Sequence, residues 1–384
     1  MVAAAAREAE PLRVLIAGGG FAALEAGLAL RALAQDRISL SFVAPGPVLH
    51  YQPAATVEAF GPQPVLAYSW TEIADDLHAH YQLGRVEAVA PDEKFVRLAS
   101  GPRLDYDVLI LCIGARALAG IAGARTFRDQ RDLSAFAALL AELADGQLTR
   151  LVFAVPPGSS WPLPLYELAL SSAAHAQRAG VAAEISIVTP EAEPLALFGR
   201  SVSWGLRDVL DGHEVRFLPG CTPVAVRRDG ALELQADGSV PADAVVTVPQ
   251  LCAHPISGVP ASWWGFVPTD ARGRVEGLHD VYAAGDMCAF PVKQGALATQ
   301  QADRIAHTIA SGLGLALEEP DEGTVLQARL VGSGTTLYLR CELDWQGRAT
   351  VGTLRHAEPG PLDCAKVFGR YLTPYLELRE PLAA

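Results

Sequence analysis

The sequence predicts an α/β fold built on parallel sheets, and three observations support this prediction. A short apolar strand at 13–17 runs directly into a cluster of glycines and then into a helix rich in Ala and Leu. Two further apolar strands, within 104–115 and 281–284, also lead into a glycine. Half of the 384 residues are hydrophobic and only 19% are charged, as expected for parallel strands buried on both faces.

The glycines after the first strand form the pattern G-x-G-x-x-A, with Gly18, Gly20 and Ala23 at its fixed positions. Gly18 allows a tight turn, Gly20 lets a pyrophosphate approach the backbone, and Ala23 keeps the helix close to the strand. Phe21 and Ala22 complete the candidate contacts in the first turn, where free N–H groups and the helix dipole favour anions. Because a strand precedes the pattern and a helix follows it, dinucleotide binding is favoured over ordinary strand-turn-helix packing.

The segment 280–302 indicates which dinucleotide is bound. Its apolar strand ends on Gly285 and Asp286, and a helix is expected from about Gly295, with Ala296 in its first turn. An aspartate on a tight turn can hold ribitol or pyrophosphate-side hydroxyls of FAD, and the helix N-terminus can stabilise the negative charge of reduced flavin. The alternative is a plain surface turn with an aspartate cap, which the first motif makes less favourable.

A third strand, LDYDVLILCIGA at 104–115, ends on Gly114. With these motifs, nearly the whole chain resembles the FAD-dependent pyridine nucleotide–disulfide oxidoreductases, which carry such a strand between their two FAD motifs. The nearer branch looks like the type II NADH dehydrogenases and sulfide:quinone oxidoreductases, because the loop 49–53 is similar to their Tyr-x-Pro loop. The resemblance implies a place beside the flavin for Tyr51 and a backbone contact near the adenine for Val86.

The resemblance and the alternation of strands and helices predict two interleaved Rossmann-like three-layer domains plus a small α+β C-terminal domain. Residues 1–120 and 248–318 would form the FAD-binding domain, and 121–247 an inserted NAD(P)-binding-like domain. Residues 319–384 would form a C-terminal interface domain that includes a short helix at 365–372.

Two departures from the family pattern affect the functional interpretation. The second strand ends on Ala44-Pro45-Gly46, without the acidic residue that usually holds the ribose hydroxyls, so backbone, water or other side chains must hold the adenosine. The inserted domain reads VPPGSSWP at 155–162, where the family has a second glycine-rich turn. Prolines have no N–H to donate, and Trp161 would crowd a pyrophosphate, so an ordinary NAD(P)H site is not expected. Sulfide:quinone oxidoreductases carry a cysteine near this position. This chain has none there, so a sulfide-oxidising role lacks its main residue.

Two charged residues are the candidate catalytic groups. Glu167 resembles the family's glutamate at the start of the inserted domain's helix, so it is expected to handle protons or orient substrate; a carboxylate that merely favours the helix start is the alternative. Lys293 resembles the family's lysine after the Gly-Asp pair, where a cation would stabilise reduced flavin, although an isolated lysine is usually solvated. Cys288 and Cys364 are candidate redox thiols, with a structural role as the simpler interpretation.

Composition excludes several other classes of function. A net charge of −13 argues against nucleic acid and anionic membranes as partners. Six cysteines form no CxxC pair and no zinc spacing, which indicates a reducing compartment and no metal site. The N-terminus does not read as a signal peptide, and prolines break the longest uncharged run, at 244–269. A cytoplasmic protein without membrane association is therefore expected.

These observations predict an FAD-dependent oxidoreductase that passes two electrons through flavin N5 from an unidentified donor to a separate acceptor. The donor and the acceptor could each be a small molecule or a protein. The sequence also leaves open whether the protein forms a homodimer. One alternative is an NAD(P)H:quinone-type oxidoreductase with an altered nucleotide cradle, so NAD(P)H is left open as a second cofactor. Another alternative is an FAD-binding, redox-responsive scaffold with little turnover.

Overall fold

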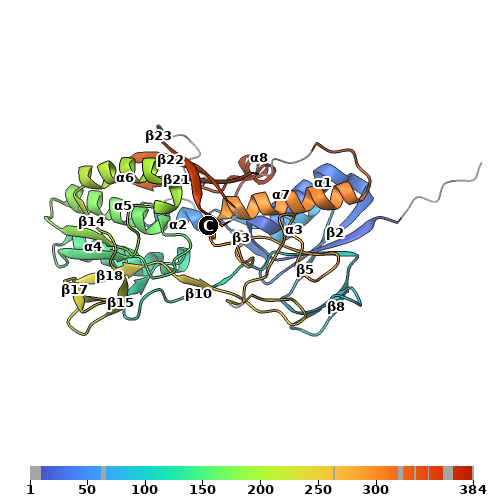
Figure 1. Cartoon of the computed structure of the whole chain (residues 1–384), viewed down its shortest axis with the longest axis horizontal. Coiled ribbons are helices and arrows are strands. Elements are labelled where there is room, and N and C mark those ends of the chain that lie inside the picture. Colours follow the sequence, from blue (N-terminus) through green and yellow to red (C-terminus); the bar gives the residue numbers. More distant parts are fainter. Residues whose placement is uncertain are drawn as a thin grey trace, which may run out of the picture.

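The computed structural model describes residues 10–61, 66–262, 264–318, 323–332, 334–344, 346–357 and 366–382. It has two lobes, each built on a parallel sheet, and an antiparallel C-terminal sheet spans the region between them (Figure 1). The first lobe is formed by two stretches of the chain that lie on either side of the second lobe in the sequence.

The first lobe has three layers around a parallel sheet of order β20-β9-β1-β2-β5. Two long helices pack side by side on one face, and a small antiparallel sheet covers the other face. The parallel strands are β1 (Leu12–Ala17), β2 (Ile38–Ala44), β5 (His80–Leu83), β9 (Val108–Leu111) and β20 (Val281–Ala283). The long helices are α1 (Phe21–Ala34) and α7 (Gly295–Gly312), and the small sheet consists of β6 (Val86–Ala90), β7 (Phe95–Leu98) and β8 (Arg103–Asp105). Four short strands and α-helices lie between β2 and β5: the antiparallel pair β3 (Val48–His50) and β4 (Ala67–Ser69), with α2 (Ala55–Glu58) between them in the chain, and then α3 (Trp70–Asp76).

The second lobe repeats this plan with a parallel sheet of order β11-β18-β12-β13-β14. Helices cover one face and a three-stranded antiparallel sheet covers the other. The parallel strands are β11 (Arg125–Thr126), β12 (Arg150–Ala154), β13 (Glu184–Val188), β14 (Val215–Leu218) and β18 (Ala244–Thr247). The helices are α4 (Leu133–Ala144), α5 (Leu163–Ala179) and α6 (Arg200–Gly212), and the antiparallel strands are β15 (Pro223–Val226), β16 (Leu232–Leu234) and β17 (Gly238–Val240). Two antiparallel strands, β10 (Arg116–Leu118) and β19 (Gln250–Cys252), link the lobes where the chain leaves and re-enters the first.

The C-terminal sheet consists of β21 (Thr324–Gly332), β22 (Thr335–Leu343) and β23 (Ala349–Ala357). Alternate residues of β21 are buried, and Leu326, Ala328 and Leu330 join the hydrophobic core of the second lobe beside α5. The Gln300 side chain of α7 exchanges hydrogen bonds with the backbone of Val325. The sheet therefore packs on both lobes and holds them together.

The expected helix at 365–372 is wrong for its described part, because the final helix, α8, spans Leu372–Glu377. Pro374 lies in the first turn of α8, where its missing N–H leaves no helical hydrogen bond unmade. Residues 366–371 are not helical, and the N–H groups of Lys366 and Val367 donate to the hydroxyl of Tyr51, each at 2.7 Å. Cys364 lies outside the described residues.

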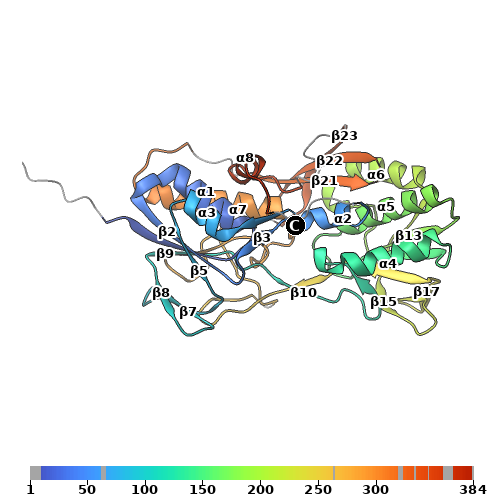
Figure 2. The same cartoon turned by 180° about the vertical axis from the view of Figure 1, so that it is seen from behind.

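Residues 366–382 form a strap across the first lobe, which we call the C-terminal strap. The buried carboxylate of Glu25, on α1, accepts hydrogen bonds from the N–H groups of Tyr371 at 3.1 Å and Leu372 at 2.6 Å. Burial raises the pKa of this carboxyl to about 7. The strap ends beside β4, where the N–H of Leu382 donates to the carbonyl of Ala67 at 2.7 Å, and Figure 2 shows α8 above the helices of the first lobe. Hydrogen bonds along its length thus fix the strap to the first lobe.

Candidate functional site

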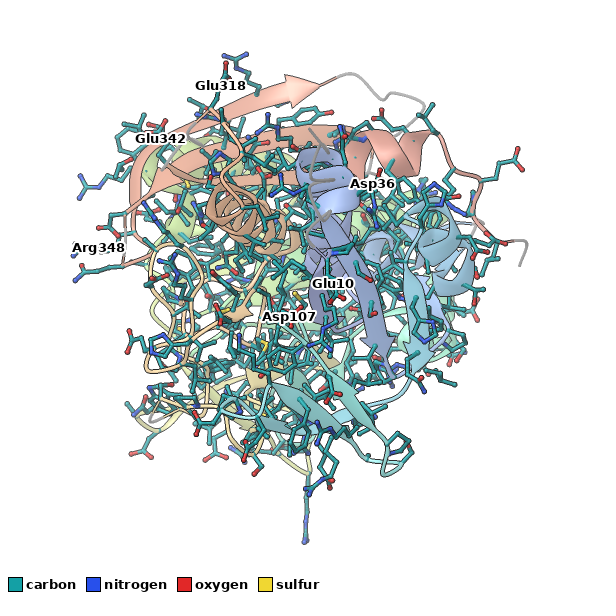
Figure 3. All side chains as sticks on the ribbon, turned by 90° about the vertical axis from the view of Figure 1, so that its right-hand side faces the viewer. Glu10, Asp36, Asp107, Glu318, Glu342 and Arg348 are labelled. Atoms are coloured by element: carbon teal, nitrogen blue, oxygen red, sulfur yellow. The ribbon has the colours of Figure 1, made fainter. Side chains whose placement is uncertain are left out.

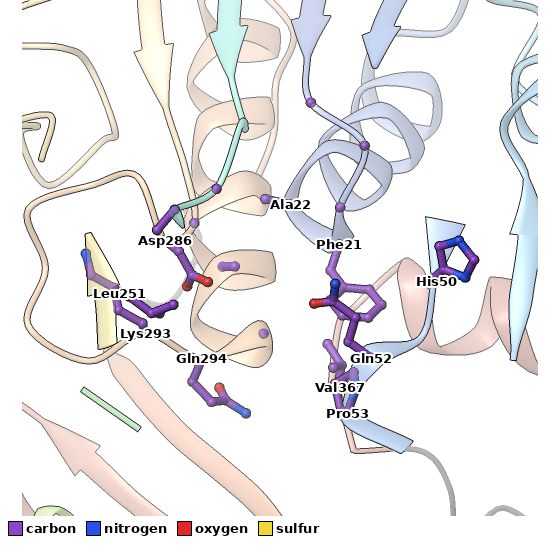
Figure 4. A pocket seen from close by; sticks show the side chains of 18 of the residues that line it. Phe21, Ala22, His50, Gln52, Pro53, Leu251, Asp286, Lys293, Gln294 and Val367 are labelled. Carbon is purple, nitrogen blue, oxygen red and sulfur yellow. The ribbon is translucent and has the colours of Figure 1, made fainter. Parts of the chain in front are cut away.

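A cavity of about 960 Å³ opens at the carboxyl ends of β1, β9 and β20 and extends to the N-terminal turn of α5 (Figure 4). This volume lies at the upper end of the range of roughly 300–1,000 Å³ for small-molecule sites. Such sites usually lie at the carboxyl edge of a parallel sheet, where the strand order reverses. The first lobe, the second lobe and the C-terminal strap all contribute to its walls.

Most of the site residues expected from the sequence line this single cavity. Those that line it are Gly18, Gly20, Phe21, Ala22, Val86, Gly114, Glu167, Gly285, Asp286, Lys293 and Gly295. Three others do not. Ala23 and Ala296 are fully buried within α1 and α7, where a small side chain allows close packing, and Tyr51 is buried against the strap.

The turn between β1 and α1 has the geometry of an anion cradle. Gly18 adopts a φ of +145°, and a Cβ there would overlap the carbonyl oxygen of Cys112, so only glycine fits. A Cβ on Gly20 would meet no protein atom within 4 Å. Within the described ranges, the N–H groups of Gly20, Phe21 and Ala22 donate to no protein acceptor. This open helix N-terminus offers what a pyrophosphate needs.

Asp286 and Lys293 form the opposite side of the cavity from Phe21 and Val367 (Figure 4). In the described part of the chain, no protein group donates a hydrogen bond to the Asp286 carboxylate, so it can accept one from a ligand hydroxyl. Burial raises the pKa of Asp286, and the neighbouring Lys293 ammonium opposes this rise. The site thus keeps one carboxylate with free acceptor capacity where the sequence predicts contact with FAD.

The Lys293 side chain is 7% exposed and holds its charge inside the protein. Its ammonium donates to the carbonyl oxygen of Cys288 and lies 4.0 Å from the centre of the Phe266 ring. Burial lowers the pKa of Lys293 to about 8, although Asp286 opposes this effect. The lysine is therefore a buried cation of the cavity wall and not a solvated surface residue.

This shift has a measurable consequence for stability. Between pH 8 and 10.5 the unfolded chain carries the lysine proton while the folded chain has lost it, so the free energy of unfolding rises with pH over this range. We expect the wild type to gain up to about 3 kcal/mol relative to Lys293→Met between pH 7 and pH 10.5. Urea unfolding of both proteins at the two pH values measures this gain, and a difference that does not change with pH contradicts the prediction.

Glu167 belongs to a buried cluster that closes the cavity beside α5. Its carboxylate accepts two hydrogen bonds from the Lys366 ammonium, at 2.7 and 2.8 Å, and one from the Thr56 hydroxyl at 2.8 Å. The N–H of Val331, in β21, donates to the same carboxylate at 2.9 Å. Lys366 also donates to Thr56 Oγ1, so all three of its protons are used. Glu167 is 1% and Lys366 6% exposed, and four separate parts of the chain meet in this cluster.

Sequence reasoning missed Lys366 and Thr56 as site residues. The nearest signal for Lys366 is its place in the run AKVF, where a single charge stands among apolar residues. A buried lysine needs an acidic partner, and Glu167 is one of the two acidic residues, with Asp286, that the sequence places at the site. Tyr51 has a related role, because its hydroxyl fixes the backbone that carries Lys366.

The Pro-rich turn before α5 makes hydrogen bonds within the protein and contributes to the cavity wall. Ser159 donates its N–H to the carbonyl of Pro156 at 3.1 Å, and the Gln250 amide donates to Pro157 O at 2.8 Å. Trp161 packs against Phe198 with ring centres 6.1 Å apart and lines the cavity. The turn is therefore held by the protein's own contacts.

The carboxylate that follows β13 is also used internally. Glu191 accepts hydrogen bonds from the hydroxyls of Tyr166 at 2.7 Å and Thr189 at 3.1 Å, and from the N–H of Ala196 at 3.2 Å. In a dinucleotide site of this fold, an acidic residue near this strand end would bind the ribose hydroxyls. In the second lobe, the carboxylate that follows β13 is thus bonded within the protein.

Other expected site chemistries can be compared with the described residues. Cys112 and Cys288 are both buried, and burial raises the pKa of both thiols, that of Cys288 to about 12. Within the described ranges, no group of three or more His, Cys, Asp or Glu side chains could hold a metal ion. No helix in the same part of the chain is long and apolar enough to span a bilayer.

The fold and the cavity are those of a two-lobed dinucleotide-dependent oxidoreductase. Residues 12–306 match the sequence model of the pyridine nucleotide-disulphide oxidoreductases, and this chain belongs to that family. The family and this architecture make it a flavin-dependent oxidoreductase with FAD as the implied cofactor.

Solved structures share the fold at low sequence identity. The sulfide:quinone oxidoreductase from the hyperthermophilic bacterium Aquifex aeolicus has a TM-score of 0.80 at 16% identity, covering 95% of this chain and 90% of that one. A ferredoxin reductase from Rhodopseudomonas palustris has a TM-score of 0.65 at 18% identity, covering 86% and 82%. Putidaredoxin reductase in a covalent complex with putidaredoxin has a TM-score of 0.65 at 20% identity, covering 87% and 82%. No curated protein sequence matches this chain.

Proposed function

We propose that this chain is an FAD-dependent oxidoreductase whose electron donor does not bind as a nicotinamide nucleotide at the second lobe. The observation that carries this proposal is one cavity that joins an open helix N-terminus, at Gly20, to a proline-rich turn already held by internal contacts. The first lobe offers free N–H groups for a dinucleotide, whereas the Ser159 N–H and the Pro157 carbonyl in the turn of the second lobe are already bonded within the protein.

The residues present fit FAD in the first lobe. The N–H groups of Gly20, Phe21 and Ala22 would hold the pyrophosphate, and Asp286 would accept hydrogen bonds from ribitol-side hydroxyls. When bound, FAD supplies the two-electron redox chemistry. Lys293 places a positive charge in the wall of the same cavity, where it favours any negative charge that develops there.

Glu167 and Lys366 are proposed to orient a polar substrate. Both line the cavity, and their side chains are held by Thr56 and by the backbone of Val331. A charge pair fixed in this way presents a constant dipole to a substrate and does not need to reorganise during a reaction. The donor and acceptor would meet the cavity between the lobes, where this pair and Trp161 lie.

An anaerobic absorbance titration tests the proposal. The purified protein is loaded with FAD and titrated with NADH, NADPH, sulfide and finally dithionite. We expect an oxidised-flavin spectrum that NADH and NADPH leave unchanged and that dithionite bleaches. Bleaching by NADH or NADPH would instead support the NAD(P)H:quinone-type alternative, and a quinone added next would then restore the spectrum.

The remaining outcomes also decide between functions. Flavin that is bound tightly but reduced only by dithionite, with a partner that binds one redox state, would support the redox-responsive scaffold. The absence of a flavin spectrum after added FAD would contradict the proposal as a whole. A cytoplasmic location and a homodimer stay predictions from the sequence.

A further inference from the structure

The walls of the cavity differ in charge from the chain as a whole. The chain has 43 acidic and 30 basic residues, and carboxylates such as those of Glu318 and Glu342 lie on its exposed outer surface (Figure 3). Apart from histidines, the charged residues that line the cavity are five cations and two carboxylates: Arg85, Arg128, Lys293, Arg329, Lys366, Glu167 and Asp286. Basic groups thus outnumber acidic ones in the lining, which favours ligands that carry negative charge.

Arg128, which follows β11, has one side of its guanidinium fixed by the protein. Its Nη1 donates to the two carboxylate oxygens of Asp132 at 3.1 and 3.4 Å and to the carbonyl of Thr126 at 3.3 Å. The backbone N–H of Arg128 also donates to Asp132, at 2.8 Å. In the part of the chain that the structure describes, no protein group accepts a hydrogen bond from Nε or Nη2. Asp132 therefore holds the guanidinium without using its Nε–Nη2 edge.

The Nε–Nη2 edge is the one through which other arginines of this protein bind carboxylates. Arg131 donates from Nε and Nη2 to the two oxygens of Asp129 at 2.8 and 2.6 Å. Arg13 binds Asp107 in the same way, at 3.1 and 2.7 Å. Two parallel bonds of this kind match the planar geometry of a carboxylate and add to the charge attraction. In Arg128 the same edge belongs to a side chain of the cavity wall that is 34% exposed.

The position of Arg128 suits a substrate that lies between the lobes. Gln130, two residues later, donates from its side-chain amide to the carbonyl of Tyr51 at 3.2 Å, so this segment of the second lobe contacts the loop that is expected beside the flavin. The strands β11, β18 and β12 are neighbours in one parallel sheet, so Arg128 and the turn that carries Trp161 follow strands that end at the same edge. Trp161 and Leu251 line the cavity as well and offer apolar surface.

We propose that the substrate of the second lobe is a small organic carboxylate, held by parallel hydrogen bonds from Nε and Nη2 of Arg128. The apolar part of this substrate lies against Trp161 and Leu251. Asp132 is the positioning residue, because it keeps the guanidinium oriented before the substrate arrives and so reduces the conformational freedom lost on binding. This inference rests on the proposed function, in which the partner at the second lobe is not a nicotinamide nucleotide.

Isothermal titration of the FAD-loaded protein with benzoate and with benzamide tests the proposal. The two probes share an apolar ring, but only benzoate has a carboxylate, and bound FAD keeps both probes out of the anion cradle. The wild type is expected to bind benzoate about 10-fold more tightly than benzamide, at the lower end for hydrogen bonds to a charged group because Arg128 is partly exposed. Arg128→Gln is expected to weaken benzoate binding by the same factor and to leave the affinities for benzamide and FAD unchanged.

Two further variants separate the paired hydrogen bonds from charge alone. Arg125→Gln is a matched control, because Arg125 forms an exposed ion pair with Glu142 at 3.7 Å but lies outside the residues that line the cavity. It is expected to bind benzoate like the wild type. Arg128→Lys keeps the positive charge but not the paired edge, so it is expected to keep only part of the preference for benzoate.

The absorbance spectrum of the bound flavin then shows whether this site faces the flavin. Benzoate is expected to perturb the spectrum of the wild type. The same benzoate concentration is expected to leave the spectrum of Arg128→Gln unchanged, and benzamide is expected to perturb both proteins equally.

The contrary results are distinguishable from one another. Equal affinities of the wild type for benzoate and benzamide would overturn the proposal, as would a benzoate affinity that Arg128→Gln leaves unchanged. Full affinity in Arg128→Lys would contradict the paired hydrogen bonds. Benzoate binding that depends on Arg128 but does not perturb the flavin would show that the site is no substrate site. Failure to bind FAD would contradict the proposed function itself, and the same titrations of the FAD-free protein would then decide the carboxylate site separately.

Discussion

Replacement of Lys366 by methionine is expected to lower the free energy of unfolding by about 3–5 kcal/mol. The change removes the only cation that contacts the Glu167 carboxylate among the described residues and leaves that charge 1% exposed. The Thr56 hydroxyl and the Val331 N–H still donate to it, but they cannot neutralise it. Urea unfolding of the wild type and of Lys366→Met at neutral pH measures the loss.

Two further variants separate the buried charge from simple loss of contacts. The double variant Glu167→Gln/Lys366→Met removes both charges and is expected to recover much of the stability, because the uncompensated carboxylate is gone. Lys94→Met breaks the exposed ion pair between Lys94 and Asp280 and is expected to cost less than about 1 kcal/mol. A loss for Lys366→Met as small as that for Lys94→Met would contradict the prediction.

The second large effect concerns the anion cradle. Gly20→Val is expected to weaken FAD binding about 5- to 150-fold while the protein remains folded, since crowding a fitted site costs about 1–3 kcal/mol. Gly20 has an ordinary φ of −110° and open space where its Cβ would lie, so the valine enters the cavity and not the protein core. Isothermal titration with FAD gives the affinity, and far-ultraviolet circular dichroism confirms the fold.

Two neighbouring comparisons sharpen this test. Gly18→Ala is expected to destabilise the protein itself, because a Cβ there meets the carbonyl oxygen of Cys112 at a positive φ. Gly212→Ala, at the end of α6 and outside the residues that line the cavity, is expected to bind FAD like the wild type. Wild-type affinity in Gly20→Val would show that no pyrophosphate lies against this turn.

Much of the fold could be predicted from the sequence because its signals are local. The turn at Gly18 and the Gly285-Asp286 turn each follow a strand directly, and the apolar runs at 13–17 and 281–284 form β1 and β20. The final helix could not be placed in this way. Its start at Leu372 depends on Glu25, which accepts the N–H groups of Tyr371 and Leu372 from a distant helix. Local propensity alone does not contain such a contact.

The candidate site likewise contains residues that local motifs predict and residues that only long-range packing brings together. The cradle and the expected cavity positions of Asp286, Lys293 and Glu167 follow from motifs within short segments, and the structure brings them to one cavity. The partners of Glu167 lie 111 residues earlier, at Thr56, and 199 residues later, at Lys366. Which distant side chains meet depends on how the two lobes and the strap pack. That packing is a property of the whole fold and has no signature at any single position.

The C-terminal strap also determines the order in which the protein can be assembled during synthesis. Lys366 leaves the ribosome 315 residues after Tyr51, whose hydroxyl holds it in place. Until then the cavity lacks the wall formed by Lys366 and Val367, and Glu167 has no countercharge from this segment. The nascent chain therefore presents the glycine cradle with one side open, and docking of the strap completes the enclosure. A chain that stops before this segment would be left with an unfinished cavity and an uncompensated carboxylate in its wall.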